Sequence, residues 1–464
     1  MEFTQAGYES LVQDIFRRFP SVQKVGFKNG AYKPGLERMR AFDQALGYPS
    51  RQFRSIHVAG TNGKGSVANM LASVLSSCGL RTGLFTSPHI LDFRERMVVA
   101  SRPYSGQMPP ETGPCQIPRP YVFNFLTRWL PWITEHELSF FEITTGMAFR
   151  WFADQKVDVA VIEVGLGGRL DSTNILEKPE LAIVTTIGLD HMALLGNTLD
   201  RIAAEKAGIF KAGVPALVGE SNPETDPVFD AYKPVYADRV TPSLWFRHEA
   251  LLKDMDLMAD VQKHNLRTVL AAVDLLVPAF PALKDADAVL DGIVHTARNM
   301  AFHGRWERLS AQPYVVADIG HNAQALRYNF AQLERCVASG AFSSLIIVYG
   351  IMADKDLDAI LPLMPQNATY IFTAPATDRA LPADEILKRF LKARTGGWGP
   401  DMSLRDPVRA FSAPTVREAV QMAVQLAQNL SEQLSRSASA GPQAPPLVYI
   451  GGSTFVVSEA LPLF

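Results

Sequence analysis

Residues 56–71 read IHVAGTNGKGSVANML, and this stretch decides the fold of the chain. It begins with apolar residues typical of a buried strand, passes through a turn containing Gly60, Gly63 and Gly65, and ends in residues with helical periodicity. A strand, a glycine-rich turn and a helix start in this order direct backbone N–H groups and the positive helix end toward an anion. The stretch therefore predicts a phosphate-binding loop in an α/β domain.

Two side chains of this loop have chemistry suited to a nucleotide. Lys64 offers a mobile positive charge for the β- and γ-phosphates, and Ser66 can cap the helix or contact a magnesium ion. The spacing departs from the common GxxxxGK[ST] pattern, because Gly60 and Gly63 lie close together and Gly65 separates Lys64 from Ser66. The alternative is an ordinary turn with a solvated lysine. The complete order of strand, glycines, lysine, serine and helix favours the phosphate loop.

Short runs rich in Val and Ile alternate with helical segments along the whole chain, which predicts parallel strands covered by helices on both faces. The runs form two series, SIHVAG, GLFTSP, VDVAVIEVG, LAIVTTIG and VPALVGE, then YVVADIG, LIIVYGI, ATYIFTAP and LVYIGGS. A chain of 464 residues also exceeds what one core usually organises. We therefore predict an α/β fold with two domains, an N-terminal P-loop-type ATPase domain with a largely parallel sheet, residues 1–303, and a smaller Rossmann-like α/β domain, residues 304–464.

Composition excludes several classes of protein. Lys and Arg total 45 against 47 for Asp and Glu, so no nucleic-acid partner is expected. Cys78, Cys115 and Cys336 show no CxxC spacing, which argues against a disulfide framework and fits a reducing cytosol. The N-terminus lacks a signal-peptide pattern, and no run approaches the roughly 18 apolar residues of a membrane span. We expect a soluble, cytoplasmic protein without a membrane partner.

Two segments rich in Pro, Gly or Ser are expected to be irregular. Residues 101–120, SRPYSGQMPPETGPCQIPRP, are expected to form neither a helix nor a central strand. They are either a substrate lid or a solvent loop without a role. The stretch SRSASAGPQAPP near the C-terminus is expected to be a flexible connector.

Acidic and imidazole groups follow strands of the first series. Glu163 ends VDVAVIEVG, and the predicted strand LAIVTTIG delivers Asp190 and His191 at its own end. The carboxyl ends of parallel strands are where α/β sheets bind ligands, so an acid and an imidazole can converge there on one ion. The alternative for His191 is a hydrogen-bonded turn histidine.

The second series has a similar pair. Asp318 and His321 follow YVVADIG, where an acid can hold a ribose or a metal-linked water and an imidazole can meet a phosphate. The alternative is helix capping by Asp318 or Asn322.

Taken together, the motifs occur in the order of a known family. The stretches are HVAGTNGKGS, TSPHI with FRERM, FFEITT, EVGLGGRLDSTN, GLDHMALLG, EKAGIFK, HNLRTVLAA, HGRWE, DIGHN and GGST. This combination resembles folylpolyglutamate synthase and dihydrofolate synthase, relatives of the Mur ligases of cell-wall synthesis. The resemblance extends from about Gly35 to the last predicted strand, and EVGLGGRLDSTN and GTNGKGS are its most specific parts.

The resemblance implies an ATP-dependent amide ligase that adds L-glutamate to a folate or dihydropteroate carboxylate through an acyl phosphate. It implies an ATP-binding, Mur-ligase-like central domain with substrate loops over residues 1–303 and a glutamate-ligase domain over residues 304–464. The expected partners are ATP, Mg²⁺, L-glutamate and the folate or dihydropteroate, and a monomer is expected. Two alternatives stay open: a Mur-type cell-wall peptide ligase and a nucleotide-switched binding protein, although the chain has no NKxD guanine-reading motif.

The resemblance also implies roles for individual residues. The ATP-binding residues are Thr61, Asn62, Gly63, Lys64, Gly65, Ser66, Asn265, Arg305 and Asp318. The magnesium ligands are Ser87, Glu163, His191 and Lys206. The residues that contact the pterin-bearing substrate are Ser139, Phe140, Phe141, Glu142, Leu170, Asp171 and Ser172. The catalytic residues are Lys64, Lys206 and His321.

Two of these roles compete with simpler hypotheses. From its helix alone, Lys206 is a surface lysine, whereas the resemblance implies that it takes up carbon dioxide and becomes a carbamate. Burial would favour the neutral amine that this reaction needs, and the anion formed could support a magnesium site. Simple phosphate-loop reasoning nominates Ser66 for the metal. We favour Ser87, because the extra Gly65 displaces Ser66 from its usual place.

Overall fold

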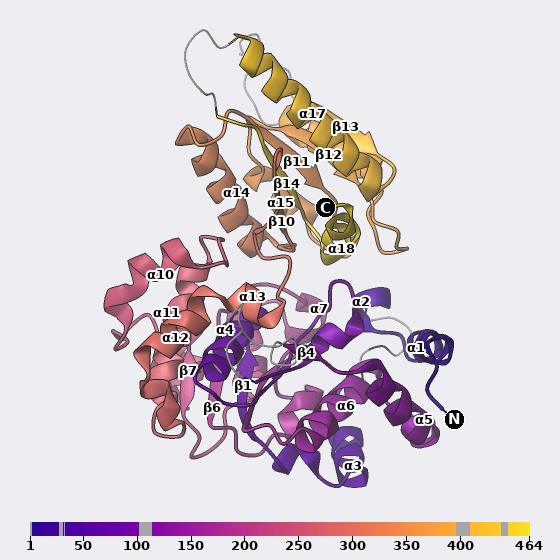
Figure 1. Ribbon diagram of the computed structural model, residues 1–464, viewed down its shortest axis with the longest axis vertical. Helices are drawn as coiled ribbons and strands as arrows, with labels where there is room; N and C mark the ends of the chain where they lie inside the picture. The colour runs from indigo at the N-terminus through magenta and orange to yellow at the C-terminus, as the bar shows by residue number, and fades with distance from the viewer. Residues whose placement is uncertain (1, 27–30, 32, 102–113, 396–408, 438–443) are drawn as a thin grey trace. The chain divides into compact units, whose positions relative to one another are not determined.

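The computed structural model describes residues 2–26, 31, 33–101, 114–395, 409–437 and 444–464 (Figure 1). The chain forms two compact units, Met1–Asp256 with Gln262–Phe302, and Leu257–Val261 with His303–Phe464. Each unit contains one sheet and its own core. In the described part of the chain, no helix has the length and apolar character needed to cross a bilayer.

The sheet of the N-terminal unit has the strand order β4-β3-β2-β5-β1-β6-β7-β8 among the described residues. Strands β2, β5, β1, β6, β7 and β8 are parallel, and β3 and β4 extend the β2 edge in antiparallel fashion. The strands are β1 Arg54–Ala59, β2 Thr82–Phe85, β3 Met97–Ala100, β4 Cys115–Gln116, β5 Val159–Glu163, β6 Leu181–Val184, β7 Ala216–Val218 and β8 Val235–Tyr236. The fold class predicted from the apolar runs is confirmed.

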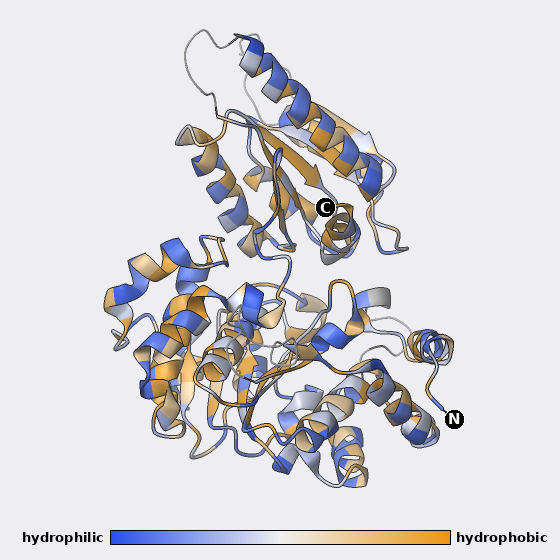
Figure 2. Ribbon diagram, in the orientation of Figure 1, coloured by the Kyte–Doolittle hydropathy of each residue, from blue (hydrophilic) through white to orange (hydrophobic). Residues whose placement is uncertain are grey.

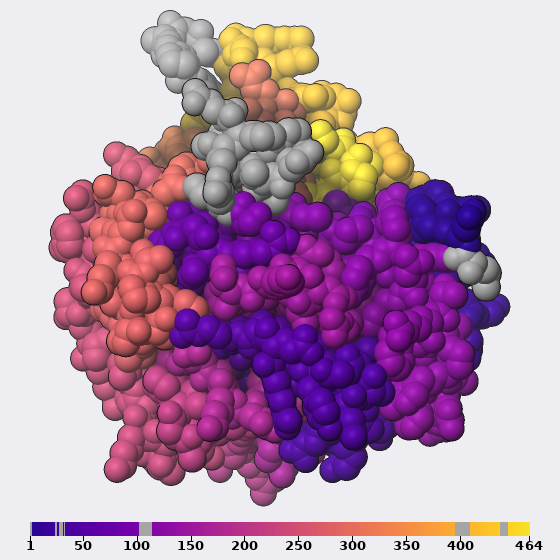
Figure 3. Space-filling model, turned by 60° about the horizontal axis from the view of Figure 1, so that its bottom comes forward, coloured from indigo at the N-terminus to yellow at the C-terminus, as the bar shows by residue number. Residues whose placement is uncertain are grey.

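Helices cover both faces of this sheet. The helices of this unit are α1 Gln5–Arg18, α2 Val22–Val25, α3 Glu37–Ala45, α4 Lys64–Ser77, α5 Arg119–Glu135, α6 Phe140–Asp154, α7 Met192–Leu195, α8 Leu199–Ala207, α9 Asp226–Asp230, α10 His248–Asp254, α11 Gln262–Leu276, α12 Ala286–Val294 and α13 Thr296–Met300. The short 3₁₀ helices are η1 Pro49–Arg51, η2 Phe93–Arg96, η4 Ser172–Ile175, η5 Trp245–Arg247 and η6 Pro281–Lys284. Space-filling representation shows indigo surface from the start of the chain lying between magenta and pink surface of the same unit (Figure 3).

Helix α4, which follows the phosphate loop, is buried along nearly its whole length. It packs on β2 and β5 and is covered by α11, α12 and α13. Most of the stability of a helix in a protein comes from its tertiary packing, and this burial fixes the start of α4 relative to the strands. The helix ends at Ser77, shortly before Gly79, whose φ of +86° is the left-handed conformation expected at a helix stop.

The opposite face of the sheet carries a second core layer. Side chains alternate along β5, so that Ala160 and Ile162 face a cluster built from α1, α5 and α6, which includes Phe149 and Phe152. Figure 2 shows the strands of the sheets largely in orange and the outer faces of the helices largely in blue. The carboxyl end of β5, with Glu163, is thereby held between two packed layers.

The C-terminal unit has the strand order β13-β12-β11-β14-β10-β9 among the described residues. All neighbours are parallel except β9 with β10. Its elements are β9 Glu307–Ala311, β10 Tyr314–Asp318, α14 Ala323–Ala338, β11 Leu345–Tyr349, α15 Leu357–Ile360, η7 Leu361–Leu363, β12 Thr369–Thr373, α16 Ala383–Thr395, β13 Ala410–Ala413, α17 Val416–Ser437, β14 Leu447–Gly451, α18 Thr454–Ala460 and η9 Leu461–Leu463. Leu257–Val261 belongs to this unit, because Gln332 hydrogen-bonds to the backbone at Met258 and Asp260.

Three sequence-based expectations need correction. Strand β6 ends at Val184, so Asp190 and His191 follow it after a loop and do not stand at its end. Helix α5 begins at Arg119, inside the segment expected to be irregular, because the aromatic and aliphatic residues after Pro120 pack into the core. The expected connector begins inside a helix, because residues 435–437 form the end of α17. Residues 102–113 and 438–443 lie outside the described residues, so the expected lid and the middle of the connector stay predictions.

Candidate active site

The loop between β1 and α4 is held by the segment that follows β6. The backbone N–H of Thr61 donates to the carbonyl of Thr186 at 2.7 Å, and the Thr61 hydroxyl accepts the N–H of Gly188 at 3.0 Å. The Thr185 hydroxyl donates to the carbonyl of Asn62 at 2.6 Å. Since β1 and β6 are neighbours, these bonds fix the conformation of the loop before any ligand arrives.

Two glycines of the loop are required by its geometry. Gly60 has a φ of +148°, and a Cβ there would collide with the Thr185 hydroxyl. Gly63 has a φ of +85°, and a Cβ there would collide with the side-chain oxygen of Asn265. Gly63 precedes α4, and no side-chain cap is bonded to the helix start. The first N–H groups of a helix lack intrahelical partners, so this end of α4 is suited to an anion.

Two lysines meet at one backbone carbonyl. Lys64 Nζ donates to the carbonyl of Gly60 at 3.0 Å and to that of Thr61 at 3.1 Å. Lys206 Nζ, from α8, donates to the same Gly60 carbonyl at 2.8 Å. The structure therefore brings Lys64 and Lys206, which are far apart in the sequence, to the same point of the phosphate loop.

Lys206 is buried, with 4% of its surface exposed, so the surface-lysine hypothesis is wrong. Burial, together with the positive charge of Lys64, lowers the pKa of the Lys206 amine from 10.5 to about 7. The carboxylates of Asp190 and Asp171 act in the opposite direction. A large fraction of Lys206 is consequently a neutral amine near neutral pH, the form that carbamate formation requires.

Ser87 and Glu163 lie in direct contact at the ends of β2 and β5. The backbone N–H of Ser87 donates to Glu163 Oε2 at 2.9 Å, and Glu163 is 3% exposed. His191 precedes α7 with a φ of +52°, and its N–H donates to Asp190 Oδ1 at 2.9 Å. Of the four predicted magnesium ligands, Ser87 and Glu163 are therefore in contact with each other, His191 contacts Asp190, and Lys206 contacts the phosphate loop.

These donors suit a magnesium ion bound together with phosphate. Among the described residues, no three His, Cys, Asp or Glu side chains are grouped closely enough to hold a metal. Mg²⁺ is usually bound by one or two carboxylates, waters and substrate phosphates, and an all-protein cage is unusual for it. Glu163, a buried carboxylate, fits that pattern.

Ser66 is hydrogen-bonded to a different helix. Its hydroxyl is bonded to the side chain of Gln262 on α11 at 3.4 Å, and Gln262 in turn accepts from Asn265 at 2.8 Å. All three side chains are buried. The contacts of Ser66 are therefore those of a residue that ties α4 to α11.

The predicted substrate residues around α6 have mainly structural contacts. Ser139 and Glu142 form a capping box at the start of the helix, and Glu142 also pairs with Arg38 at 3.1 Å. Phe140 is buried in the core. Phe141 is half-buried against Gly165, where a Cβ would collide with its ring. Within this set, Phe141 retains side-chain surface for a ligand.

The second substrate set lies in the loop after β5. Leu170 is half-buried, whereas Asp171 and Ser172 are buried at the start of η4. Asp171 accepts hydrogen bonds from the N–H groups of Leu166 and Thr173. Burial raises the pKa of the Asp171 carboxyl, and these hydrogen bonds oppose the rise. Asp171 therefore shapes the loop from within.

The C-terminal unit holds the remaining predicted residues. Asp318, at the end of β10, accepts hydrogen bonds from Trp306 N–H at 2.9 Å and from Gly320 N–H at 2.7 Å. Burial raises its pKa, while these donors and the charge of Arg305 counteract the effect. His321 Nδ1 lies 3.0 Å from the carbonyl of Ile319.

The capping hypothesis for this region holds for Asn322. Its side chain accepts from Ala325 N–H at 2.9 Å at the start of α14. The two carboxylate oxygens of Asp318 are instead bonded to backbone and to Asn329.

The sequence did not single out Arg96 as a site residue. Its guanidinium is 3% exposed and donates to His89 Nδ1 and to Gln23, both at 2.9 Å. Glu163 attracts this buried charge, although burial lowers the pKa of Arg96 to about 10. The sequence signal that could have found Arg96 is its position, a charged residue directly before the apolar strand MVVA.

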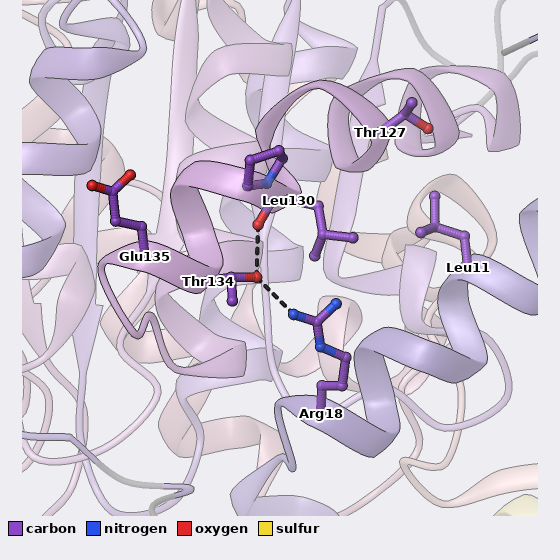
Figure 4. A pocket seen from close by; sticks show the side chains of 7 residues that line it. Leu11, Arg18, Thr127, Leu130, Thr134 and Glu135 are labelled. Atoms are coloured by element: carbon purple, nitrogen blue, oxygen red, sulfur yellow. Dashed lines mark hydrogen bonds between the residues drawn. The ribbon is translucent and has the colours of Figure 1, made fainter.

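A cavity of about 540 Å³ lies elsewhere in the N-terminal unit, between α1 and α5 (Figure 4). Its lining residues are Leu11, Arg18, Thr127, Leu130, Pro131, Thr134 and Glu135. Arg18 donates to the Thr134 hydroxyl at 2.7 Å across it. None of the predicted site residues lines this cavity.

Comparison with known proteins identifies the family. Residues 128–224 match the Mur ligase middle domain, and residues 304–431 match the glutamate ligase domain of Mur ligases. Folylpolyglutamate synthase of Lacticaseibacillus casei is 30% identical over 398 residues, which cover 78% of this chain and 85% of that protein. The chain belongs to the folylpolyglutamate synthase and dihydrofolate synthase family. Dihydrofolate synthase/folylpolyglutamate synthase of Bacillus subtilis (strain 168) is 33% identical over 344 residues, 70% of this chain and 76% of that protein.

Solved structures agree with this assignment. The folylpolyglutamate synthase of Mycobacterium tuberculosis, complexed with ADP, superposes with a TM-score of 0.75 at 26% identity, covering 99% of this chain and 98% of that one. The chain is thus an ATP-dependent ligase that adds glutamate, and this assignment is favoured over a cell-wall ligase. The prediction made from the sequence motifs is confirmed.

Proposed function

We propose that this synthase activates the carboxylate of a folate or dihydropteroate as an acyl phosphate and then joins it to the amine of L-glutamate. The observation that carries the proposal is the meeting of Lys64 and the buried Lys206 at the carbonyl of Gly60. This point lies at the start of α4, where the helix end and the loop N–H groups favour phosphate.

The chemistry explains why ATP is needed. A carboxylate resists attack by an amine, because its charge is delocalised and oxide is a poor leaving group. Attack of a carboxylate oxygen on the γ-phosphorus breaks the bond to ADP and gives an acyl phosphate. The glutamate amine then adds to the acyl carbon, the amide forms, and phosphate departs with one oxygen of the original carboxylate. The amine loses a proton in this second step.

The phosphate loop supplies binding and charge stabilisation for the first step. Lys64 can exchange its two carbonyl partners for phosphate oxygens, which stabilises charge on the transferring group. The rigid hydrogen bonds of Thr61 and Asn62 mean that little reorganisation accompanies this exchange. A folylpolyglutamate synthase structure from Mycobacterium tuberculosis, 27% identical, is complexed with ADP and AMPPCP, which supports a nucleotide at this loop.

Ser87, Glu163 and His191 would hold Mg²⁺ together with Lys206 as a carbamate. When bound, the ion would neutralise phosphate charge during transfer. Glu163 contributes a buried carboxylate, and the low pKa of Lys206 favours carbon dioxide uptake by its amine. Because Ser66 is engaged by Gln262, its hydroxyl is less suited to the ion than that of Ser87.

The remaining roles are assigned by resemblance. Asn265, Arg305 and Asp318 contact the nucleotide, and His321 contacts phosphate. Residues 1–303 act as the ATP-binding domain and residues 304–464 as the glutamate-ligase domain. Phe141 and Leu170, which keep exposed surface, contact the pterin-bearing substrate. We further propose a cytoplasmic monomer.

Replacing Gly63 with Ala is expected to abolish ADP binding while the protein stays folded. The residue has a φ of +85°, and the added methyl would collide with Asn265, so the loop must change its shape. Calorimetric titration with ADP measures the effect. Gly79→Ala is the matched control, since Gly79 has a φ of +86° but nothing lies near its Cβ. Equal ADP affinity for wild type and Gly63→Ala would contradict the assignment of this loop.

Among metal-site variants, Glu163→Gln and His191→Ala are each expected to lower activity in a way that raised magnesium partly restores. Ser87→Ala is expected to cost more activity than Ser66→Ala, because the Ser66 hydroxyl already bonds to Gln262. Initial rates measured over a magnesium titration decide both points. If Ser66→Ala proves the more damaging, the ordinary phosphate-loop assignment of the metal is correct.

A single assay tests the proposed substrates. Purified protein is given ATP, magnesium and labelled glutamate with either dihydropteroate or tetrahydrofolate, and the products are separated by chain length. Glutamate incorporation that depends on one or both pterin substrates supports the proposal. ATP hydrolysis without any amide product would oppose it.

A further inference from the structure

A buried chain of three side chains links β1 to the glycine-rich loop, residues 165–171. His57 lies within β1 with no exposed surface, and its Nε2 is 2.8 Å from Thr173 Oγ1. The Thr173 hydroxyl donates to Asp171 Oδ1 at 2.5 Å. Asp171 Oδ2 accepts the N–H of Leu166 at 2.9 Å. The chain therefore runs from the centre of the sheet to the backbone of the loop.

The contacts determine where the protons of this chain lie. Both oxygens of Asp171 are already acceptors, for the N–H of Leu166 and for the N–H and hydroxyl of Thr173. A hydroxyl has one proton, which Thr173 gives to Asp171, so its oxygen can only accept from His57. His57 consequently carries its proton on Nε2, and Nδ1 is an acceptor to which none of the described residues donates.

A histidine at this position has an energetic cost. Burial, together with the charge of Lys211, lowers the pKa of His57 to about 3, so the ring is neutral. A buried acceptor without a donor is unfavourable, because it has lost its hydrogen bonds to water. Val58 and Ile56, the neighbours of His57 in β1, are apolar and have no such cost. The bond to Thr173 is the polar contact that accounts for an imidazole here.

The loop at the other end of the chain packs against the backbone of Lys206. A Cβ at Gly168 would lie 2.8 Å from the carbonyl of Glu205 and 3.1 Å from Lys206 Cα. Arg169 N–H donates to the same Glu205 carbonyl at 2.8 Å. Such close approach leaves little room for the loop to shift without moving Lys206. Lys206 is therefore connected to β1 in two ways. Its backbone contacts the loop that the His57 chain holds, and its Nζ donates to Gly60, which directly follows β1.

We propose that His57 is a positioning residue, which acts through Thr173 and Asp171 to hold residues 165–171 against Lys206. This inference rests on the proposed function of Lys206 in ligation. Without the hydrogen bond from His57, the Thr173 hydroxyl can rotate away from Asp171, and the loop loses one of the contacts that hold its conformation beside α8. Turnover then falls, whereas ADP affinity is retained, because the phosphate loop keeps its own bonds to Thr185 and Thr186.

The kinetic test uses two pairs of variants in the full-length enzyme. In the first pair, Thr173→Val removes the hydroxyl and Thr173→Ser keeps it. In the second pair, His57→Leu removes the N–H donor, whereas His57→Gln supplies an amide N–H donor in its place. We expect Thr173→Val and His57→Leu to lower kcat by about 10- to 100-fold at unchanged Kd for ADP, as for other residues that orient a site through a second group. Thr173→Ser and His57→Gln are expected to restore most of the turnover.

Coupling separates positioning from a general loss of packing. If both side chains act through one chain, the kcat of the double variant His57→Leu/Thr173→Val equals that of the slower single variant, whereas independent defects multiply. Multiplying defects, or wild-type kcat in Thr173→Val, would overturn the proposal. Should Thr173→Val fail to fold, the His57→Leu and His57→Gln pair decides the kinetic question.

A spectroscopic measurement tests the chain independently of activity. NMR of protein labelled with ¹⁵N-histidine reports which ring nitrogen of His57 carries the proton. We expect Nε2–H in the wild type and in Thr173→Ser, and a proton on Nδ1 would overturn the inference. A wild type that shows this tautomer but no ligation would instead refute the proposed function.

Discussion

Lys64→Ala is expected to reduce kcat for glutamate ligation by about two to three orders of magnitude, or roughly 3 to 4 kcal/mol of transition-state stabilisation. The lysine lies on the phosphate loop, and its present partners are two backbone carbonyls that phosphate oxygens can replace. Its removal takes away a charge that serves the transferring phosphoryl group. Thermal unfolding should change little, because Lys64 is only half-buried.

Initial-rate kinetics at saturating ATP measures this effect. Lys178→Ala is a suitable control, since Lys178 is an exposed lysine of the same unit and should leave kcat unchanged. Turnover close to wild type in Lys64→Ala would contradict the phosphate-loop assignment and favour the alternative of an ordinary turn with a solvated lysine.

Lys206→Ala is expected to cause the second large loss, and the loss should fall on turnover more than on ATP affinity. The substitution removes the amine that would become the carbamate, while the hydrogen bonds of Thr61 and Asn62 keep the phosphate loop in place. Because Lys206 is buried, its loss also leaves a cavity next to Gly60. Acetate or formate at high concentration can fill that space and supply a negative charge.

Rescue by different salts tests the carbamate directly. Acetate or formate should raise the kcat of Lys206→Ala, and chloride at equal ionic strength should not, since screening alone affects both salts alike. Lys211→Ala provides a control, because Lys211 is a less buried lysine that follows α8 by a few residues. Full activity of Lys206→Ala without added anion would leave no role for a carbamate.

The fold was largely predictable because central parallel strands have a strong sequence pattern. VDVAVIEVG is apolar on both faces, as a strand covered by helices on two sides must be, and it forms β5. Edge strands lack this pattern. Strand β8 contains only Val235 and Tyr236, and in β13, Ala410–Ala413, Ala413 alone is buried. Neither strand could be recognised from its sequence without the neighbouring strand.

The candidate site was predictable where local sequence determines local structure. The glycines of residues 56–71 predict a turn that leads into a helix. The structure contains this turn, with Gly60 and Gly63 in conformations that favour glycine. The burial of Lys206 could not be predicted from the local sequence. Its burial comes from packing against β1 and the glycine-rich loop, which are distant in the sequence, so its own helical periodicity indicated only a surface residue.

Contacts with structural partners were the hardest feature to predict. Asp171 was expected to face a substrate, yet both of its oxygens accept hydrogen bonds from nearby residues, Leu166 and Thr173. Ser66 has the residue type of a metal ligand, but its hydroxyl meets Gln262 on a helix nearly 200 positions later. Such partners are decided by tertiary packing and leave no local signal.

Transfer of an oxygen isotope tests the acyl phosphate most directly. The synthase is supplied with ATP, glutamate and a folate or dihydropteroate whose reacting carboxylate carries ¹⁸O on both oxygens, and the released phosphate is analysed by mass spectrometry. The proposed mechanism predicts one ¹⁸O atom in each phosphate formed during ligation and one in the new amide. Phosphate without ¹⁸O, released in step with amide formation, would contradict it.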